Sequence, residues 1–423
     1  MKKSLIALAV MAAAGAASAQ SSVTLFGIVD ATIAHGRASG TGAANKTALA
    51  NSGYNSSRIG FRGTEDLGGG MAASFWLEGS LGNDDGTAGQ RIPVGNQNVL
   101  NGASPTNPNG VGDGAGLVFN RRSTVSLSGG WGEVRLGRDY TPSFWNLTVF
   151  DPFGTNGVGT TLTLVGPAGG LGTAGNAMAP VGTRGVIVRA SNDIGYFLPA
   201  NLGGFYGQFN YWLGENTFNG ANSARDGTGW GGRLGYGAGP FNVAISYART
   251  AYDATPVNPV QPITTTNTFT GAVAPTAAQI AAQRAGDFRT WNIGGQWDFG
   301  VAKVMGHYTR EQRDSSAGNA GTGIPASGEI DGRGWLLGTL VPVGAGEIRA
   351  SYSTYKIDAG AGADPRARQL ALGYVHNLSK RTALYATAAR VQNRNGAAVS
   401  LNGATLGTAT SSTGYDLGIR HSF

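Results

Sequence analysis

The chain has 423 residues, of which 71 are glycine and none is cysteine, and its formal net charge is +7. The glycines follow no period of three and would destabilise helices by roughly 0.5–1 kcal/mol each, so collagen and a helical bundle are excluded. The lack of cysteine excludes disulfides and thiolate chemistry, and the scattered lysines and arginines argue against a nucleic-acid partner.

The N-terminal segment predicts export. Lys2 and Lys3 precede a short apolar stretch over residues 5–17, and Ala17-Ser18-Ala19 supplies the small residues that signal peptidase requires. We expect cleavage after Ala19, which leaves residues 20–423 and lowers the net charge from +7 to +5 because both lysines are removed. No later segment has the ~18 consecutive apolar residues of a transmembrane helix.

The rest of the chain alternates between apolar and polar residues, which is typical of half-buried strands in a soluble sandwich as well as in a barrel. Near the start, Val23, Leu25 and Val29 share one parity against Thr24 and Asp30. Sixteen such strands are predicted, over 21–37, 57–67, 71–81, 119–129, 133–145, 184–198, 205–215, 227–237, 241–253, 287–299, 302–314, 329–342, 347–358, 367–378, 382–394 and 413–423.

The connections between these strands alternate in length. Seven are short turns, such as Gly68-Gly69-Gly70, and the other eight are mostly long, including 82–118, 146–183 and 254–286. A β-sandwich has no reason to separate its loops in this way, whereas an outer-membrane barrel has short turns at one end and long loops at the other. The sequence therefore predicts an all-β fold: a 16-stranded antiparallel transmembrane β-barrel in which the first strand pairs with the last.

Several arginines fall on the polar parity of these strands. Arg58 and Arg62 do so in the second strand and Arg122 in the fourth; Arg189 is expected to face inward in the sixth, with Arg184 on the other parity or at the strand entry. An arginine facing lipid at the midplane would cost about 2–4 kcal/mol, so we expect these side chains to line a water-filled lumen.

The long connection 146–183 is apolar enough to fold into the barrel rather than extend into solvent. It carries one acid, Asp151, within Phe150-Asp151-Pro152-Phe153-Gly154. A carboxylate loop opposite an arginine wall would set up a transverse field at a constriction, and charge rings of this kind set ion preference.

At this point the chain resembles the Gram-negative general diffusion porins, a family of trimeric sixteen-stranded barrels, and in particular their betaproteobacterial branch. The resemblance covers the mature chain. It is carried by SSVTLFGIVDATI at 21–33, SSRIGFRGTEDLGGG at 56–70, FNRRSTVSLSGGWGEVRLGRDY at 119–140, FDPFG at 150–154 and GYDLGIRHSF at 414–423.

The resemblance implies that Arg58 lies on the pore wall, together with Arg122 or its competitor Arg121, and with a third arginine that is Arg184 or Arg189. This chain departs from the family's P-E-F-G loop motif because its acid precedes the proline. It also has no basic residue near Ile28, where the family has one in the first strand.

The resemblance further implies a homotrimer in contact with outer-membrane lipid and lipopolysaccharide, with Phe423 as the C-terminal signal for the barrel-assembly machinery.

Other functions have less support in the sequence. The chain has four histidines, at 35, 307, 376 and 421, and they form no nucleophile–base arrangement, so we expect neither an enzyme nor a metal or other cofactor. An adhesin barrel would need no acidic loop opposite an arginine wall. A porin specific for small anionic solutes stays open as an alternative. We expect passive diffusion of small hydrophilic solutes with a mild preference for anions.

Overall fold

The computed structural model describes residues 22–88, 119–165, 188–215, 225, 227–251, 285–315, 328–358 and 364–423. The predicted signal segment, Arg184 and the second half of the 146–183 connection lie outside these residues. The long strands are β1 (Ser22–Ala38), β3 (Arg58–Gly68), β4 (Met71–Gly82), β6 (Arg122–Gly129), β7 (Gly132–Tyr140), β8 (Arg189–Phe197), β9 (Phe205–Trp212), β10 (Gly229–Ala238), β11 (Phe241–Thr250), β12 (Ala285–Asp298), β13 (Lys303–Ser315), β14 (Gly328–Val343), β15 (Gly346–Asp358), β16 (Arg366–Asn377), β17 (Thr382–Arg394) and β18 (Ser411–Ser422).

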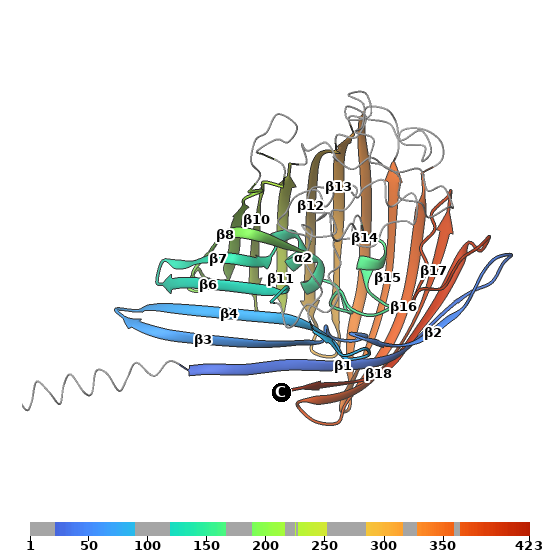
Figure 1. Cartoon of the computed structure of the whole chain (residues 1–423), viewed down its shortest axis with the longest axis horizontal. Helices are drawn as coiled ribbons and strands as arrows, with labels where there is room; N and C mark the ends of the chain where they lie inside the picture. Colours follow the sequence, from blue (N-terminus) through green and yellow to red (C-terminus); the bar gives the residue numbers. More distant parts are fainter. Residues whose placement is uncertain are drawn as a thin grey trace, which may run out of the picture.

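These strands form one closed antiparallel sheet. Each long strand pairs with the next, and β18 pairs with β1 from Ile28 opposite Ser422 to Ala38 opposite Ser412, so the sheet has no free edge. Figure 1 shows β1 and β18 side by side at the base of the view, although they lie at opposite ends of the chain. Closure satisfies the backbone groups that an edge strand would expose to lipid. The predicted sixteen-stranded barrel is confirmed.

Two short strands were not predicted. β2 (Lys46–Asn51) pairs with the upper half of β1, and β3 pairs with the lower half, so β2 and β3 together form one wall strand interrupted at residues 52–57. β5 (Thr87–Ala88) pairs only with the end of β4. The prediction of a loop from 38 to 56 was therefore wrong over β2. The sixteen wall strands remain after these two short elements are assigned to their neighbours.

The interruption in the second wall strand is held by Asp30 of β1. Its Oδ2 accepts hydrogen bonds from the backbone N–H groups of Tyr54 (2.9 Å) and Asn55 (2.6 Å). Ser57 Oγ accepts from the Asp30 N–H (2.9 Å) and donates to the Asp30 carbonyl oxygen (3.1 Å). These bonds replace part of the missing ladder and pair the backbone N–H groups of Tyr54 and Asn55 where the chain leaves the wall.

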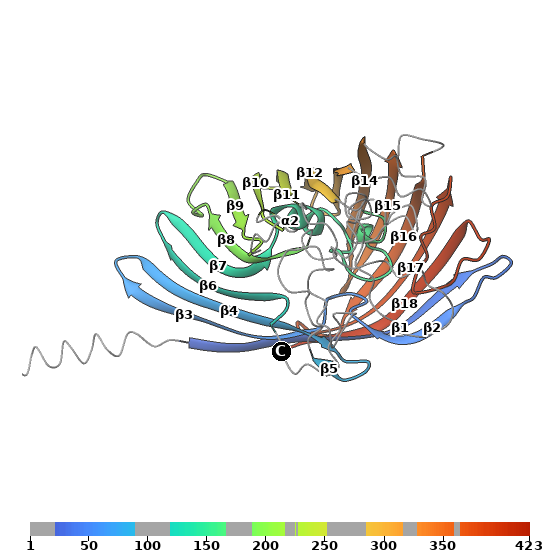
Figure 2. The same ribbon diagram turned by 45° about the horizontal axis from the view of Figure 1, so that its top comes forward.

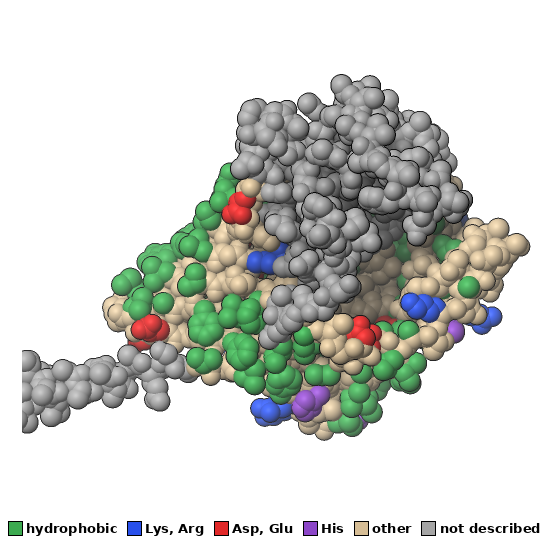
Figure 3. All heavy atoms as spheres, viewed as in Figure 1, with side chains coloured by type: hydrophobic (Ala, Val, Ile, Leu, Met, Phe, Trp, Pro, Cys, Tyr) green, Lys and Arg blue, Asp and Glu red, His purple; other side chains and the backbone are tan. Residues whose placement is uncertain are grey.

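The alternation predicted from sequence separates two environments. On β1 the side chains of Val23 and Ile33 are 64% and 55% exposed, whereas those of Asp30 and Thr32 are buried. This inverts the burial of a water-soluble core, because the large apolar side chains face outward. In the lower half of Figure 3, hydrophobic side chains form patches over much of the surface and charged ones are scattered. Among the described residues, no helix has the length and apolar character needed to cross a membrane.

The predicted strand 133–145 ends too late, because β7 stops at Tyr140. A helix, α2 (Pro142–Val149), follows it. Thr141 is its N-cap and its hydroxyl accepts from the Phe144 N–H (3.3 Å), while Pro142 occupies the first turn. A Thr-Pro pair is a common helix start because the proline has no N–H to leave unsatisfied. Figure 2 shows α2 inside the rim of strands rather than outside it.

Candidate functional site: the constriction

The inward segment is fixed first by α2. The helix contacts β9, β10, β11 and β12. Asn146 Nδ2 donates to the carbonyl oxygen of Ala244 (3.0 Å), and Asn292 Nδ2 donates to that of Ser143 (3.1 Å). Both asparagines are fully buried, so these bonds act in a site that water does not reach. The predicted inward fold of the segment after residue 146 is confirmed for its described part, up to Val165.

Beyond α2, glycines in the wall make room for the apolar side chains of the segment. A Cβ on Gly294 of β12 would overlap with the ring of Phe150, and one on Gly338 of β14 would overlap with Pro152. Further along, Gly373 of β16 lies beside Phe153, and Gly414 of β18 beside Val158. Four strands therefore provide side-chain-free positions along the path of the segment, which explains part of the high glycine content.

The far end of the segment is bound to the opposite part of the wall. The Val158 N–H donates to Asp416 Oδ2 (2.7 Å), and Gln369 Nε2 donates to the carbonyl oxygens of Val158 (3.1 Å) and Thr160 (3.2 Å). Ser56, in the interruption of the second wall strand, donates to Asn156 Oδ1 (2.6 Å). The segment is thus tied to β11 and β12 at one end and to β16, β18 and residues 52–57 at the other.

Asp151 does not have the environment that its predicted role requires. Its side chain is almost fully buried, and its carboxylate accepts from the N–H groups of Phe153 (2.8 Å) and Thr161 (3.0 Å) in its own segment. Burial raises the pKa of Asp151 to about 6, against the lowering effect of those two N–H groups and of Arg349. The carboxylate organises the turn after α2 instead of presenting a charge to the lumen.

Beside the start of α2, four arginines gather around Tyr140 and Glu78; the Tyr140 ring stacks on that of Phe144, with centroids 5.2 Å apart. The Tyr140 hydroxyl accepts from Nη2 of Arg121 (2.7 Å) and of Arg189 (3.0 Å). Arg121 also forms an ion pair with Glu78, with Nε 2.6 Å from Oε1. We call Arg58, Arg121, Arg138 and Arg189 the upper arginine cluster.

The other two members of the upper arginine cluster, Arg58 and Arg138, form no ion pair with an acid among the described residues. Arg138 donates to the Asn120 carbonyl oxygen (2.7 Å) and to Ser191 Oγ (2.7 Å). Arg58 lies within electrostatic range of Glu78 and Arg121 and has no hydrogen-bonding partner among the described side chains. Four guanidinium groups and one carboxylate give this region a formal charge of +3.

A second group of arginines lies further down the lumen. We call Arg62, Arg122 and Arg135 the lower arginine cluster. The guanidinium carbons of Arg62 and Arg122 lie 5.1 and 4.6 Å from the ring centroid of Trp76. Arg122 also approaches Asp139 (Nε to Oδ1, 3.6 Å), and Arg135 is paired with both Glu133 and Asp139. All of these residues except Asp139 line a cavity of about 370 Å³, whose walls also include Thr24, Thr64, Ser74, Phe75 and Ser126.

The structure thus places the predicted residues at different levels. Arg58 and Arg189 belong to the upper cluster, and Arg62 and Arg122 to the lower one. Arg121, the competitor of Arg122, is the one buried beside Glu78. Arg184, the competitor of Arg189, lies outside the described residues.

Sequence reasoning missed Arg138, Tyr140 and Glu78. A register shift between Gly137 and Asp139, with Gly137 at φ +129°, breaks the parity of β7 and brings Arg138 into the lumen. A glycine inside a strand is the signal that could have indicated this bulge.

Phe423 ends the last strand against the first. Its backbone N–H donates to the Gly27 carbonyl oxygen and its carbonyl accepts from the Gly27 N–H, both at 3.1 Å. The ring covers Gly27, where a Cβ would overlap with it, and 42% of the side chain is exposed on the outer face. The chain end therefore completes the barrel seam.

Comparisons with known proteins agree with this architecture. The sequence model of the family described as Gram-negative porin matches residues 5–396. Outer membrane porin protein 32 of Delftia acidovorans is 38% identical over 432 residues, covering 100% of both chains, and an outer membrane porin of Bordetella pertussis is 28% identical over 462 residues, again covering both chains fully.

Among solved structures, an anion-selective porin from Comamonas acidovorans superposes with a TM-score of 0.70 at 34% identity, covering 96% of this chain and 100% of that one. OmpT of Vibrio cholerae, solved also in a trimer form, shares the fold at 14% identity, covering 95% of this chain and 99% of that one, with a TM-score of 0.57.

Proposed function

The chain belongs to the Gram-negative porin family, and on that premise we propose that its lumen favours small anions through the upper and lower arginine clusters. As a member of that family it is an outer-membrane channel and not an enzyme. The observation that carries the proposal is the upper arginine cluster, where four guanidinium groups accompany one carboxylate beside the start of the inward segment.

The inward segment strengthens this asymmetry. Because Asp151 is buried and bonded to its own backbone, the acid expected to face the arginines is withdrawn from the lumen. Two further arginines, Arg349 and Arg420, lie over Tyr54 at 4.4 and 5.3 Å, and Arg349 is also paired with Glu347 (2.9 Å). Arginines thus occur on β15 and β18 as well as on β3, β7 and β8. A net positive fixed charge in a confined channel raises the local concentration of anions.

The experiment is the zero-current potential across a planar bilayer in a tenfold KCl gradient. Arg58→Gln with Arg138→Gln removes two of the four upper charges, and the ratio of chloride to potassium permeability is expected to fall severalfold. The matched control is Arg310→Gln, an outward-facing arginine paired with Asp331 (2.5 Å) that does not reach the lumen. An equal fall in both variants, or none in the first, would contradict the assignment.

A porin specific for small anionic solutes is the second candidate. The lower arginine cluster favours it, because Arg62 and Arg122 flank one aromatic ring in a defined cavity. Specific binding predicts that millimolar phosphate or a small dicarboxylate blocks the chloride current and that Arg62→Gln relieves the block. A general pore shows no saturable block.

We further propose a homotrimer, delivered by the barrel-assembly machinery through the strand that ends at Phe423, after cleavage behind Ala19. The trimer is tested by native mass spectrometry and the cleavage site by N-terminal sequencing of the purified porin. Deletion of Phe423 is expected to lower the amount of folded barrel in cells, because it removes both the signal and the contacts with Gly27.

A further inference from the structure

The outer face of β14 to β17 carries a group of cations at the end where the long loops begin. These cations share one face of the sheet, because Arg333 lies opposite Lys356, Lys356 opposite Arg366, and Arg366 opposite Arg394. That face is the outward one, since Trp335 and Leu370, on the same parity, are exposed. Arg368 lies two residues below Arg366 on β16, and Arg390 is exposed on β17 opposite Leu370. Six cations therefore occupy four adjacent strands on the face turned away from the lumen.

Acidic side chains neutralise only part of this charge. Asp331 is bonded to Arg310, Asp364 is paired with Lys356 (3.2 Å), and Asp358 ends β15. Within the described part of the chain, none of the five arginines at 333, 366, 368, 390 and 394 has an acid at ion-pair distance. The Nε atom of Arg333 is buried and has no hydrogen-bonding partner.

Four of these cations line a groove, which we call the head-group groove. Arg333, Lys356, Arg366 and Arg368 border a cavity of about 300 Å³ whose other walls are Tyr308, Gly334, Trp335, Tyr352 and Thr354. No acid lines it. Trp335 and Tyr352 are packed together with ring centroids 5.5 Å apart. Aromatic rings of this kind mark the level of the lipid head groups in membrane barrels.

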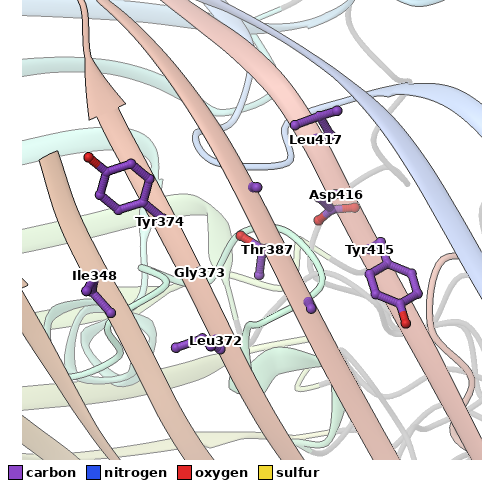
Figure 4. A pocket seen from close by; sticks show the side chains of 10 residues that line it. Ile348, Leu372, Gly373, Tyr374, Thr387, Tyr415, Asp416 and Leu417 are labelled. Atoms are coloured by element: carbon purple, nitrogen blue, oxygen red, sulfur yellow. The ribbon is translucent and has the colours of Figure 1, made fainter.

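Below the head-group groove, toward the middle of the wall, lies an apolar trough of about 550 Å³. Figure 4 shows Leu372 and Tyr374 of β16 on one side and Tyr415 and Leu417 of β18 on the other. Between them, the outward-facing residues of β17 are Ala386 and Ala388, which leave the strand almost bare. Arg390 lies two residues above Ala388, at the upper end of the trough.

We propose that the head-group groove and the apolar trough together bind one phosphorylated, acylated glycolipid of the outer leaflet. The guanidinium and ammonium groups at the top match phosphate, which arginine binds bidentately. The trough below shares strands β15 and β16 with the head-group groove and matches an acyl chain. Both halves lie on the membrane-facing surface of a barrel established as an outer-membrane porin, so the inference does not depend on the anion preference proposed for the lumen.

The test measures binding of a bisphosphorylated, hexa-acylated lipid A to the delipidated, full-length mature porin by native mass spectrometry. The triple variant Arg366→Gln/Arg368→Gln/Arg390→Gln is expected to weaken binding by about fivefold per charge removed, on the order of a hundredfold in all. Lipid A without phosphates should bind to the wild-type protein more weakly by a similar factor. The matched control, Arg249→Gln, removes an outward cation on β11 that is paired with Asp287, and should bind like the wild type.

Two further arms separate the possible occupants. Ala388→Leu fills the trough and is expected to weaken lipid A binding while leaving the trimer and its conductance intact. Equal binding by the triple variant and the wild type would overturn the proposal, as would full competition by millimolar inorganic phosphate, which would mean an anion site without a lipid. Loss of the trimer in Ala388→Leu would also overturn it, because the trough would then be a subunit contact. Unchanged conductance in each variant shows that the barrel has folded.

Discussion

The wall glycines offer a direct way to separate the barrel from the inward segment. In Gly294→Val the new Cβ occupies the space of the Phe150 ring, which is 0% exposed in the wild-type protein. Burial of a phenylalanine side chain stabilises by about 1.5–3 kcal/mol. The hydrogen bonds that tie α2 to the wall, from Asn146 and Asn292, contribute about 1 kcal/mol each. Displacing Phe150 therefore removes about half of the local attachment of the segment.

Valine favours strands, so the ladder of β12 should persist in this variant while the inward segment loosens. The matched control is Gly295→Val: this neighbouring glycine lies on the outward parity and its nearest atoms would be 3.6 Å from the new Cβ. Single-channel conductance in a planar bilayer is expected to become larger or noisier in Gly294→Val and to stay at the wild-type value in Gly295→Val. Identical traces for all three proteins would refute the idea that glycine at this position seats the segment.

Three further predictions concern the constriction. Because burial raises the pKa of Asp151 from 3.8 to about 6, its ionisation costs folding free energy as the pH rises above 3.8, reaching about 3 kcal/mol at pH 7 and about half of that at pH 5. On acidification, the melting temperature of the wild type should therefore rise relative to that of Asp151→Asn. Melting temperatures that follow pH in parallel in the two proteins would contradict the raised pKa of Asp151. Thr141→Ala removes the N-cap of α2 and should cost about 1 kcal/mol, seen as faster proteolysis of the segment, with unchanged cleavage as the contrary result. Tyr140→Phe removes the hydroxyl that accepts from Arg121 and Arg189 but removes no charge, so the anion preference should persist. Loss of the anion preference in this variant would mean that the geometry of the arginines, rather than their charge, sets selectivity.

The strands could be predicted from sequence because a barrel wall places lipid and water on alternate residues, and this period of two is visible locally. Val23, Leu25 and Ile33 share one face for that reason alone. The same local rule failed at β2, whose pairing with β1 depends on Asp30 holding residues 52–57. It also failed at α2, although Thr141-Pro142 is a helix start that sequence alone could have suggested.

The constriction was predictable only in part. The inward parity of Arg58, Arg62 and Arg122 follows from alternation, but the level of each in the lumen depends on register, which single strands do not reveal. The direction of the Asp151 carboxylate depends on N–H groups up to ten residues away, at Thr161. Arg138 reaches the lumen because Gly137 breaks the parity of β7, and no period can predict a residue that departs from it.

The central claim, that the upper arginine cluster sets ion preference, is tested most directly by reversing its charge. Arg58→Glu with Arg138→Glu changes the formal charge of this region from +3 to −1, given four arginines and one glutamate at the start. The measurement is the sign of the zero-current potential in a tenfold KCl gradient at low ionic strength, where screening is weakest. We predict the sign of anion preference for the wild type and the opposite sign for the double variant. Cation preference in the wild type, or the same sign in both proteins, would contradict the account.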